Sequence, residues 1–201
     1  ADGAILEAAQ GIIDSHFPES ADFYSHMPLE QYRSIVVDAQ TALNEGEFAR
    51  KFAATFRPQI CRILGSATPL IQTNLYLRAT RPMPEASHQE SIGWHRESFY
   101  GPDMADSINF WVPLYNVNQE NIIRYIPDSH LIPESEIILS QTEDESTPRF
   151  SAGHKMGLLY APKEIVGGVD LANSKPFALG VGDAVIFAGC LLYTSPSPRD
   201  Q

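Results

Sequence analysis

The sequence predicts a mainly β fold preceded by a group of helices, and three observations indicate this. Apolar residues recur at helical spacing through the first third of the chain. Near residue 69 the period of the apolar pattern changes from that of a helix to that of a strand. Short strand-like runs separated by Pro, Gly and Asn turns follow, as is typical of an antiparallel sandwich or barrel. We therefore expect one domain, helical over residues 1–66 and β over residues 67–189.

The expected helices are defined by their apolar stripes and their ends. Pro28 suits the first turn of a helix and Gly46 suits its end, so one helix is expected between them. Its stripe comprises Leu29, Tyr32, Val36, Ala39 and Leu43. A second stripe comprises Phe48, Phe52, Phe56, Ile60 and Ile63, and Pro58 should kink that helix. Both stripes are interpreted as core-facing surfaces without chemistry.

The first expected strand covers residues 71–78, where side chains alternate between two faces. The more apolar face comprises Ile71, Thr73, Leu75 and Leu77, and the polar face comprises Gln72, Asn74, Tyr76 and Arg78. Further strands are expected at residues 90–97, 107–116, 121–127, 136–140, 156–161 and 182–188. The polar, acidic stretch 141–148 is expected to form an exposed loop or lid.

Composition and charge narrow the classes of partner. The chain has 201 residues and a formal net charge of −11, which argues against nucleic acid and anionic membranes as partners. We find no apolar run long enough to span a membrane and no signal peptide. Cys61 and Cys190 have neither metal-site spacing nor a disulfide pattern, which fits a reducing cytoplasm. We expect a cytoplasmic protein that acts on a small molecule.

His95 and Glu97 are the candidate metal ligands. Residues two apart on a strand share a face, so this imidazole and carboxylate would converge on one metal ion. A second histidine from a later strand would complete a two-histidine, one-carboxylate triad, which leaves positions on Fe(II) for a co-substrate and O₂. The alternative interpretation is a surface His–Glu pair near a loop.

Several segments resemble one family in order and spacing. Residues 94–97 (WHRE) resemble the W-H-x-D/E motif of the phytanoyl-CoA dioxygenase-like group of Fe(II)/2-oxoglutarate oxygenases. The strand at 108–114, the P-x-S-H turn within 124–130 and the Gly-Asp strand at 179–187 are also similar to that family. The resemblance covers residues 70–189 and implies a double-stranded β-helix, a cupin-like jelly roll.

The resemblance also implies roles for individual residues. His95 and Glu97 would bind Fe(II), although the family more often has Asp at the second position. Asn74, Tyr76 and Trp111 would contact the co-substrate 2-oxoglutarate, and O₂ would be the oxidant. The alternatives are a solvated strand face for Asn74 and Tyr76 and a core aromatic for Trp111.

The end of the chain departs from the family pattern. The family has a second metal histidine just after the Gly-Asp strand and a basic residue about ten positions later, but no histidine follows Phe187. Residues 190–201 resemble a translated sequencing adapter, so we expect a non-native tail and a jelly roll that is incomplete at the C-terminus. His130 and His154 are the alternative candidates for the third ligand. We expect this fragment to be inactive and its parent protein to be active.

The predicted function is that of an Fe(II)- and 2-oxoglutarate-dependent dioxygenase. It would hydroxylate a small organic substrate, such as a carbohydrate or a secondary metabolite, and decarboxylate 2-oxoglutarate to succinate. Two alternatives stay open: a cupin-like metal-dependent isomerase or sugar-modifying enzyme, and a non-enzymatic β-sandwich binding module.

Overall fold

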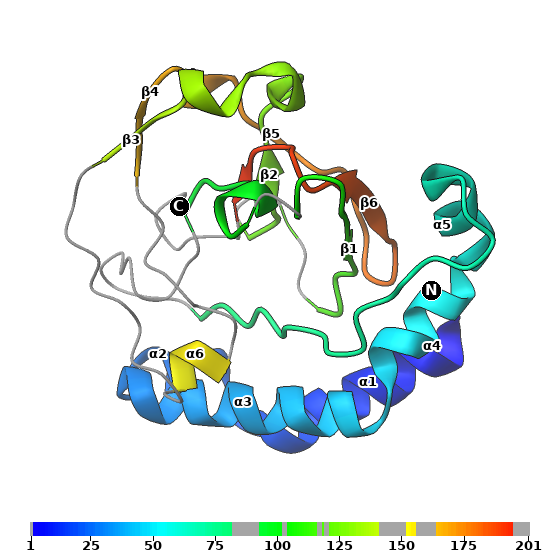
Figure 1. Cartoon of the computed structure of the whole chain (residues 1–201). Helices are drawn as coiled ribbons and strands as arrows, with labels where there is room; N and C mark the ends of the chain where they lie inside the picture. The colour runs from blue at the N-terminus through cyan, green and yellow to red at the C-terminus, as the bar shows by residue number, and fades with distance from the viewer. Residues whose placement is uncertain are drawn as a thin grey trace.

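Most of the helices form a layer along one side of the molecule, and the strands lie on the opposite side of the molecule (Figure 1). The computed structural model describes residues 2–81, 93–101, 104–115, 118, 121–140, 152–155 and 164–194. Its α-helices are α1 (Gly3–His16), α2 (Ala21–Ser25), α3 (Leu29–Glu45), α4 (Phe48–Thr55), α5 (Arg57–Leu64) and α6 (Ala152–Lys155). None of these helices is long and apolar enough to cross a membrane.

Helix α3 confirms the expected helix, and the region after it corrects the expected kink. Pro28 occupies the N-cap of α3, and the backbone N–H of Gly46 donates to the Ala42 carbonyl at its end. The second stripe belongs to two helices, α4 and α5, because Pro58 sits in the first turn of α5. A proline there lacks the N–H of a continuing helix and clashes with the preceding turn, so the chain breaks at Phe56.

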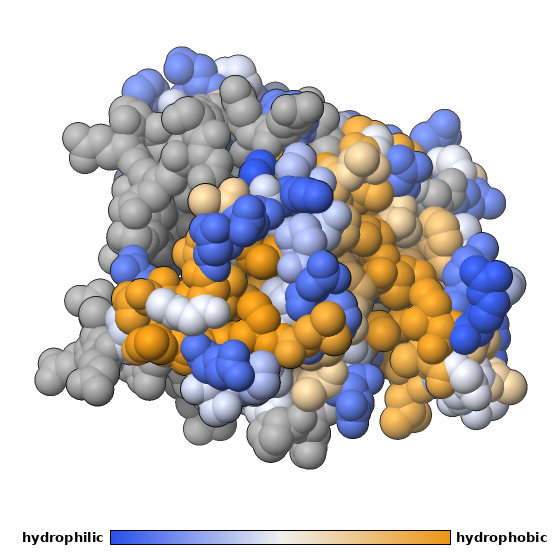
Figure 2. Space-filling model, turned by 90° about the horizontal axis from the view of Figure 1, so that it is seen from above, coloured by the Kyte–Doolittle hydropathy of each residue, from blue (hydrophilic) through white to orange (hydrophobic). Residues whose placement is uncertain are grey.

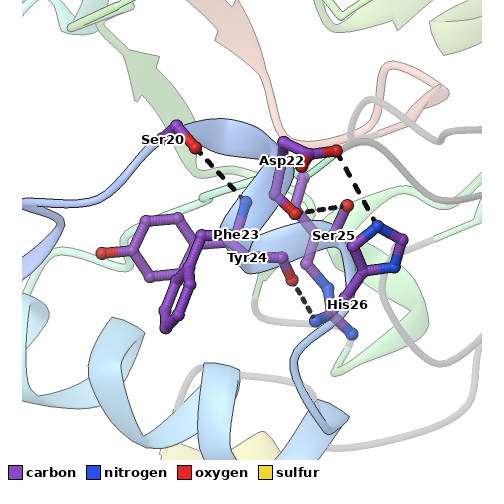
Figure 3. Close-up of polar contacts among 7 residues, drawn as sticks. Ser20, Asp22, Phe23, Tyr24, Ser25 and His26 are labelled. Atoms are coloured by element: carbon purple, nitrogen blue, oxygen red, sulfur yellow. Dashed lines mark hydrogen bonds and ion pairs between the residues drawn. The ribbon is translucent and has the colours of Figure 1, made fainter.

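Helix α2 is a short helix defined by local polar contacts (Figure 3). The Ser20 hydroxyl accepts from the backbone N–H of Phe23 at the N-terminus, as an N-cap should. The Ser25 hydroxyl donates to the Asp22 carbonyl, and the His26 ring lies 3.8 Å from the Asp22 carboxylate. Both side chains of the Asp22–His26 pair are exposed, so the contact is a surface one that contributes little to stability.

The strands are short and pair in an antiparallel manner throughout the described residues. They are β1 (Ile108–Trp111), β2 (Arg124–Tyr125), β3 (Ile138–Leu139), β4 (Ile165–Gly167), β5 (Lys175–Pro176), β6 (Val185–Ala188) and β7 (Tyr193–Thr194). They form three sheets, β1–β6, β5–β2–β7 and β3–β4. The antiparallel expectation is confirmed, and β1, β2, β3 and β6 lie within four of the predicted runs. The predicted strand 156–161 and loop 141–148 lie outside the described residues.

The expected strand at residues 71–78 is wrong, because no strand is assigned to this part of the described chain. The segment bonds to side chains of α3 instead. Leu75 donates its N–H to the Asn44 side chain and accepts from it, and the Leu77 N–H donates to the Gln40 side chain. The amide side chains of α3 therefore occupy the place of a neighbouring strand, while Leu75 and Leu77 still pack into the core.

Strand β1 has one face against the helices and the other toward the remaining strands. Phe110 and Val112 pack on a buried cluster composed of Ala9, Leu43, Phe48 and Phe52. Because side chains alternate along a strand, Asn109 and Trp111 lie on the opposite face. This arrangement turns Asn109 and Trp111 away from the helical layer.

Residues 190–194 take part in the fold. Leu192 is fully buried and packs with Ile126 and Ile137, and β7 pairs with β2. The interpretation of residues 190–201 as adapter-derived stays a prediction, because packing says nothing about where a segment comes from.

Apolar side chains also reach the surface. Figure 2 shows hydrophobic surface over much of one face of the molecule, interrupted by hydrophilic side chains. The exposed large apolar residues include Ile63, Leu64, Leu70 and Ile71 around the end of α5. Folded proteins generally expose much apolar surface, so we assign it no function.

Candidate metal centre

His95 and Glu97 are brought together by a bridge and a turn, which corrects the expected strand at residues 90–97. Residues 90–92 lie outside the described part of the chain. The backbone of His95 forms an isolated antiparallel bridge with Tyr193, through two N–H···O bonds of 3.0 Å. Glu97 begins the 3-10 helix η1 (Glu97–Phe99), and its N–H donates to the Gly189 carbonyl at 2.7 Å. The alternation of a strand therefore does not apply here, but the two side chains still share one site.

The His95 imidazole is prepared to bind a metal ion through Nε2. The side chain is buried, and its Nδ1 lies 2.7 Å from the Gly93 carbonyl, so Nδ1–H is the donor. Metal-binding histidines commonly donate one ring N–H to a carbonyl in this way and bind the ion with the other nitrogen. Burial lowers the pKa of His95, and the Arg78 charge lowers it further against the opposing effects of Gly93 and Glu97. The ring is therefore neutral at neutral pH, as a metal ligand must be.

The Glu97 carboxylate is held by two donors from distant parts of the chain. Its Oε1 accepts from the Asn109 side-chain amide at 3.1 Å and from the Tyr193 hydroxyl at 2.5 Å. Among the described residues both hydrogen bonds converge on Oε1, which leaves Oε2 available to a metal ion. The site thus offers one imidazole nitrogen and one carboxylate oxygen, a donor set that suits Fe(II).

The aromatic rings of Tyr193, Phe187 and Tyr100 lie near these two candidate ligands. The Tyr193 ring lies 4.3 Å from that of His95 and 4.8 Å from that of Phe187, measured between centroids. The Tyr100 ring also lies next to His95, with 5.7 Å between the ring centroids. Burial and the charge of Glu97 raise the pKa of Tyr100 to about 12 and raise that of Tyr193 as well. Both tyrosines therefore keep their hydroxyl protons at neutral pH.

Arg78 adds a positive charge to the site. Burial lowers the pKa of its guanidinium, while the neighbouring groups Tyr193, Tyr100, Tyr76 and Glu97 raise it. A guanidinium stays protonated despite such a shift, so Arg78 adds a positive charge that acts on the candidate ligands. Arg78 lies on the predicted polar face of residues 71–78 but is not among the site residues predicted from the sequence.

The other predicted site residues differ in position. Asn74 is exposed, and Tyr76 keeps 47% of its surface exposed, with the Arg78 guanidinium carbon 5.7 Å from its ring centroid. Trp111 is half-buried on the face of β1 that also carries Asn109. A role of Asn74, Tyr76 and Trp111 in co-substrate binding stays a prediction.

The described residues contain candidates for two of the three ligands of the expected triad, His95 and Glu97. No group of three or more His, Cys, Asp or Glu side chains able to hold a metal ion occurs among them. His130 is exposed in the 3-10 helix η3 (Ser129–Leu131), and the side chain of His154 is outside the described part. His95 and Glu97 therefore fit a metal ion as two adjacent ligands, with further positions left for other groups.

Arg96 anchors the segment between the two candidate ligands. Its side chain is buried and donates to the carbonyls of Ser129 at 2.9 Å and Ile132 at 3.0 Å. The Ser129 hydroxyl in turn accepts from the Leu192 N–H at 2.8 Å. This set of contacts ties the His95–Glu97 segment to η3 and to the residue preceding β7.

Comparison with known proteins gives one finding on ancestry. The family model of phytanoyl-CoA dioxygenase (PhyH) matches residues 18–199. The match begins just before α2 and includes β1–β7, His95 and Glu97. No curated protein and no solved structure matches the chain significantly.

Proposed function

This chain belongs to the phytanoyl-CoA dioxygenase family, and we propose that it is the metal-binding core of an Fe(II)- and 2-oxoglutarate-dependent dioxygenase. The family generally has a cupin-like jelly-roll fold and this oxygenase activity. We propose further that the short antiparallel strands are part of a double-stranded β-helix. The observation that carries the proposal is the pairing of a neutral, hydrogen-bonded His95 with an oriented Glu97.

His95 through Nε2 and Glu97 through Oε2 would hold the iron. Bound iron, with 2-oxoglutarate and O₂, supplies the oxidation, in which 2-oxoglutarate yields succinate and CO₂ while the substrate is hydroxylated. The family pattern includes a second histidine ligand, and we propose that this ligand completes the site in the parent protein.

The protein's own groups orient the ligands and shape the site. The Gly93 carbonyl holds His95 in the tautomer that presents Nε2. Asn109 holds one carboxylate oxygen of Glu97, and in this chain Tyr193 holds the same oxygen, so the other oxygen has a defined direction. The rings of Tyr100 and Phe187 limit the access of water to this side of the ligands.

The substrate class proposed is a small organic molecule, such as a carbohydrate or a secondary metabolite. Residues 94–101 (WHRESFYG) resemble segments of oxygenases that act on bacterial surface carbohydrates, and the sequence lacks a strong basic cluster for the phosphates of acyl-CoA. Ser98, Phe99 and Tyr100 follow the ligands in sequence, and we propose that they contact the substrate.

The test measures succinate formed from 2-oxoglutarate by the full chain and by its parent protein. We expect the parent protein to form succinate only with Fe(II), and His95→Gln to abolish this. His26→Gln, a change of an exposed histidine on α2, is the matched control and should be active. Turnover of 2-oxoglutarate without iron would refute the proposal.

The same experiment separates the two alternative functions. A metal-dependent isomerase would bind the ion at His95 and Glu97 but leave 2-oxoglutarate unchanged. A non-enzymatic binding module would tolerate His95→Gln without any loss of ligand binding.

A further inference from the structure

The fold places the side chain of Tyr193 beside both candidate metal ligands. His95 and Tyr193 lie directly opposite each other in an antiparallel bridge, with two N–H···O bonds of 3.0 Å between their backbones. Residues paired in this way point to the same face of the ladder. Their rings lie 4.3 Å apart between centroids, and the Tyr193 hydroxyl lies 2.5 Å from Glu97 Oε1. Tyr193 therefore contacts both ligands, although 96 residues separate it from Glu97.

The Tyr193 hydroxyl has the position of a third ligand. Adjacent ligand atoms of an octahedral ion, each about 2.1 Å from the ion, lie about 3 Å apart. The hydroxyl and Glu97 Oε1 are somewhat closer than this because a proton lies between them in the hydrogen bond. Ligands release such protons when a metal ion binds. An ion that replaces this proton would be bound by the phenolate oxygen of Tyr193, the Glu97 carboxylate and His95 Nε2.

The strands hold Tyr193 in this orientation before any ion binds. Strand β7 pairs with β2 through Tyr125 and Tyr193, and the residues on either side of Tyr193, Leu192 and Thr194, are buried. The Tyr193 ring also packs edge-on against Phe187, with 4.8 Å between the centroids. The side chain cannot leave the site without a shift of β7. Binding of an ion by Tyr193 therefore requires little ordering of the chain.

The chemistry of a phenolate determines which ion this site prefers. A phenolate is a hard, anionic oxygen donor, which favours trivalent over divalent iron, and tyrosine is an iron ligand in some haem proteins. We propose that Tyr193 is the third ligand of this chain and forms, with His95 and Glu97, a site for Fe(III), an inference that rests on the proposed metal site. When the ion binds, the O–H bond of Tyr193 breaks, an Fe–O bond forms and the proton passes to solvent, while the iron keeps its oxidation state.

The assignment concerns this chain, whatever the origin of residues 190–201. The family pattern has a histidine just after the Gly-Asp strand, whereas this chain has Tyr193 on the strand that follows β6. A phenolate ligand would stabilise iron in the ferric state. The oxygenase reaction requires Fe(II), so this chain would bind iron without supporting that reaction.

The experiment records the visible absorption of the metal-free full chain during titration with Fe(III), supplied as its citrate complex, at neutral pH. We expect a charge-transfer band from the phenolate to Fe(III) that saturates at one ion per chain. Tyr193→Phe, which removes only the oxygen, should lose the band, and its affinity for Fe(III) should fall at least about 10-fold more than its affinity for Mn(II). Tyr193→His should bind both ions without the band.

Two other tyrosines provide the controls. Tyr115→Phe removes a hydroxyl from a surface bond to Asp14 on α1 and should keep the band. Tyr100→Phe tests the other tyrosine near His95, at 5.7 Å between ring centroids, and should keep the band as well.

Three results would overturn the assignment of Tyr193. The first is an Fe(III) complex of the wild type without the band, and the second is a band that survives in Tyr193→Phe. The third is an equal loss of Fe(III) and Mn(II) affinity in Tyr193→Phe, which would leave Tyr193 only the positioning of Glu97. Failure of the proposed metal site differs from all three, because His95→Gln would then bind both ions like the wild type.

Discussion

Replacement of Gly189 by alanine tests the close packing behind Glu97. A Cβ atom at Gly189 would lie 2.6 Å from the Met104 carbonyl oxygen, 2.5 Å from the Ser107 hydroxyl and 3.2 Å from the Glu97 Cβ. The hydroxyl can rotate away, but the Met104 carbonyl is held by hydrogen bonds from the backbone N–H and the hydroxyl of Ser107. The chain must therefore move at Gly189, whose carbonyl accepts from the Glu97 N–H. We expect a loss of about 2–3 kcal/mol in the free energy of unfolding, as for overpacked cores.

Gly11→Ala is the matched control for this substitution. Gly11 lies in α1, is exposed, and has no atom within 4 Å of an added Cβ. Alanine is the better helix former, so Gly11→Ala should raise the free energy of unfolding by about 0.5–1 kcal/mol.

The assay is urea denaturation of both variants and the wild type, followed by Mn(II) titration of the folded proteins. We expect the free energy of unfolding to fall in Gly189→Ala and to rise in Gly11→Ala. Gly189→Ala should also bind Mn(II) more weakly, because the substitution displaces Glu97. A free energy of unfolding of Gly189→Ala within about 0.5 kcal/mol of the wild type would refute the reasoning.

Three further predictions concern contacts around the site and the helical layer. Asn109→Ala removes a donor to Glu97 and should weaken Mn(II) binding about 10-fold, as loss of a partner to a metal ligand generally does; unchanged affinity in calorimetry would contradict this. Arg96→Met removes two bonds to buried carbonyls and should cost about 2–4 kcal/mol in urea denaturation, whereas Arg50→Met at the surface should change stability by less than about 0.5 kcal/mol. Burial and the hydrogen bond to Asp14 raise the pKa of Tyr115 from 10.0 to about 12. The contact therefore contributes fully to the free energy of unfolding below pH 10.0, and this contribution is lost as pH rises through about 12. The stability advantage of the wild type over Tyr115→Phe should shrink across that window, and a constant difference in chemical denaturation would count against the contact.

The helices and some strands could be predicted because their signals are local. Pro28 and Gly46 bound α3 as expected, since a helix start and end depend on nearby residues. Residues 71–78 show the limit of such signals. Alternation indicated correctly that Leu75 and Leu77 enter the core, but Ile71 and Thr73 are exposed. The pattern also does not identify the partner of the backbone, a role that the side-chain amides of α3 take here.

The candidate site was predictable only in its contiguous part. The motif at residues 94–97 led to His95 and Glu97, although through a strand that the structure replaces with a bridge and a turn. Asn109 and Tyr193 lie 12 and 96 residues from Glu97, and spacing cannot pair such distant groups. A polar residue in the apolar run INFWV was the one signal that pointed to Asn109.

The central claim is that His95 and Glu97 bind one metal ion together. The most direct measurement is a Mn(II) titration of the metal-free full chain, compared with His95→Gln, Glu97→Gln and the control His26→Gln. We predict one ion per wild-type or His26→Gln chain and at least about 10-fold weaker binding in both ligand variants. Equal affinity in all four proteins would contradict the claim.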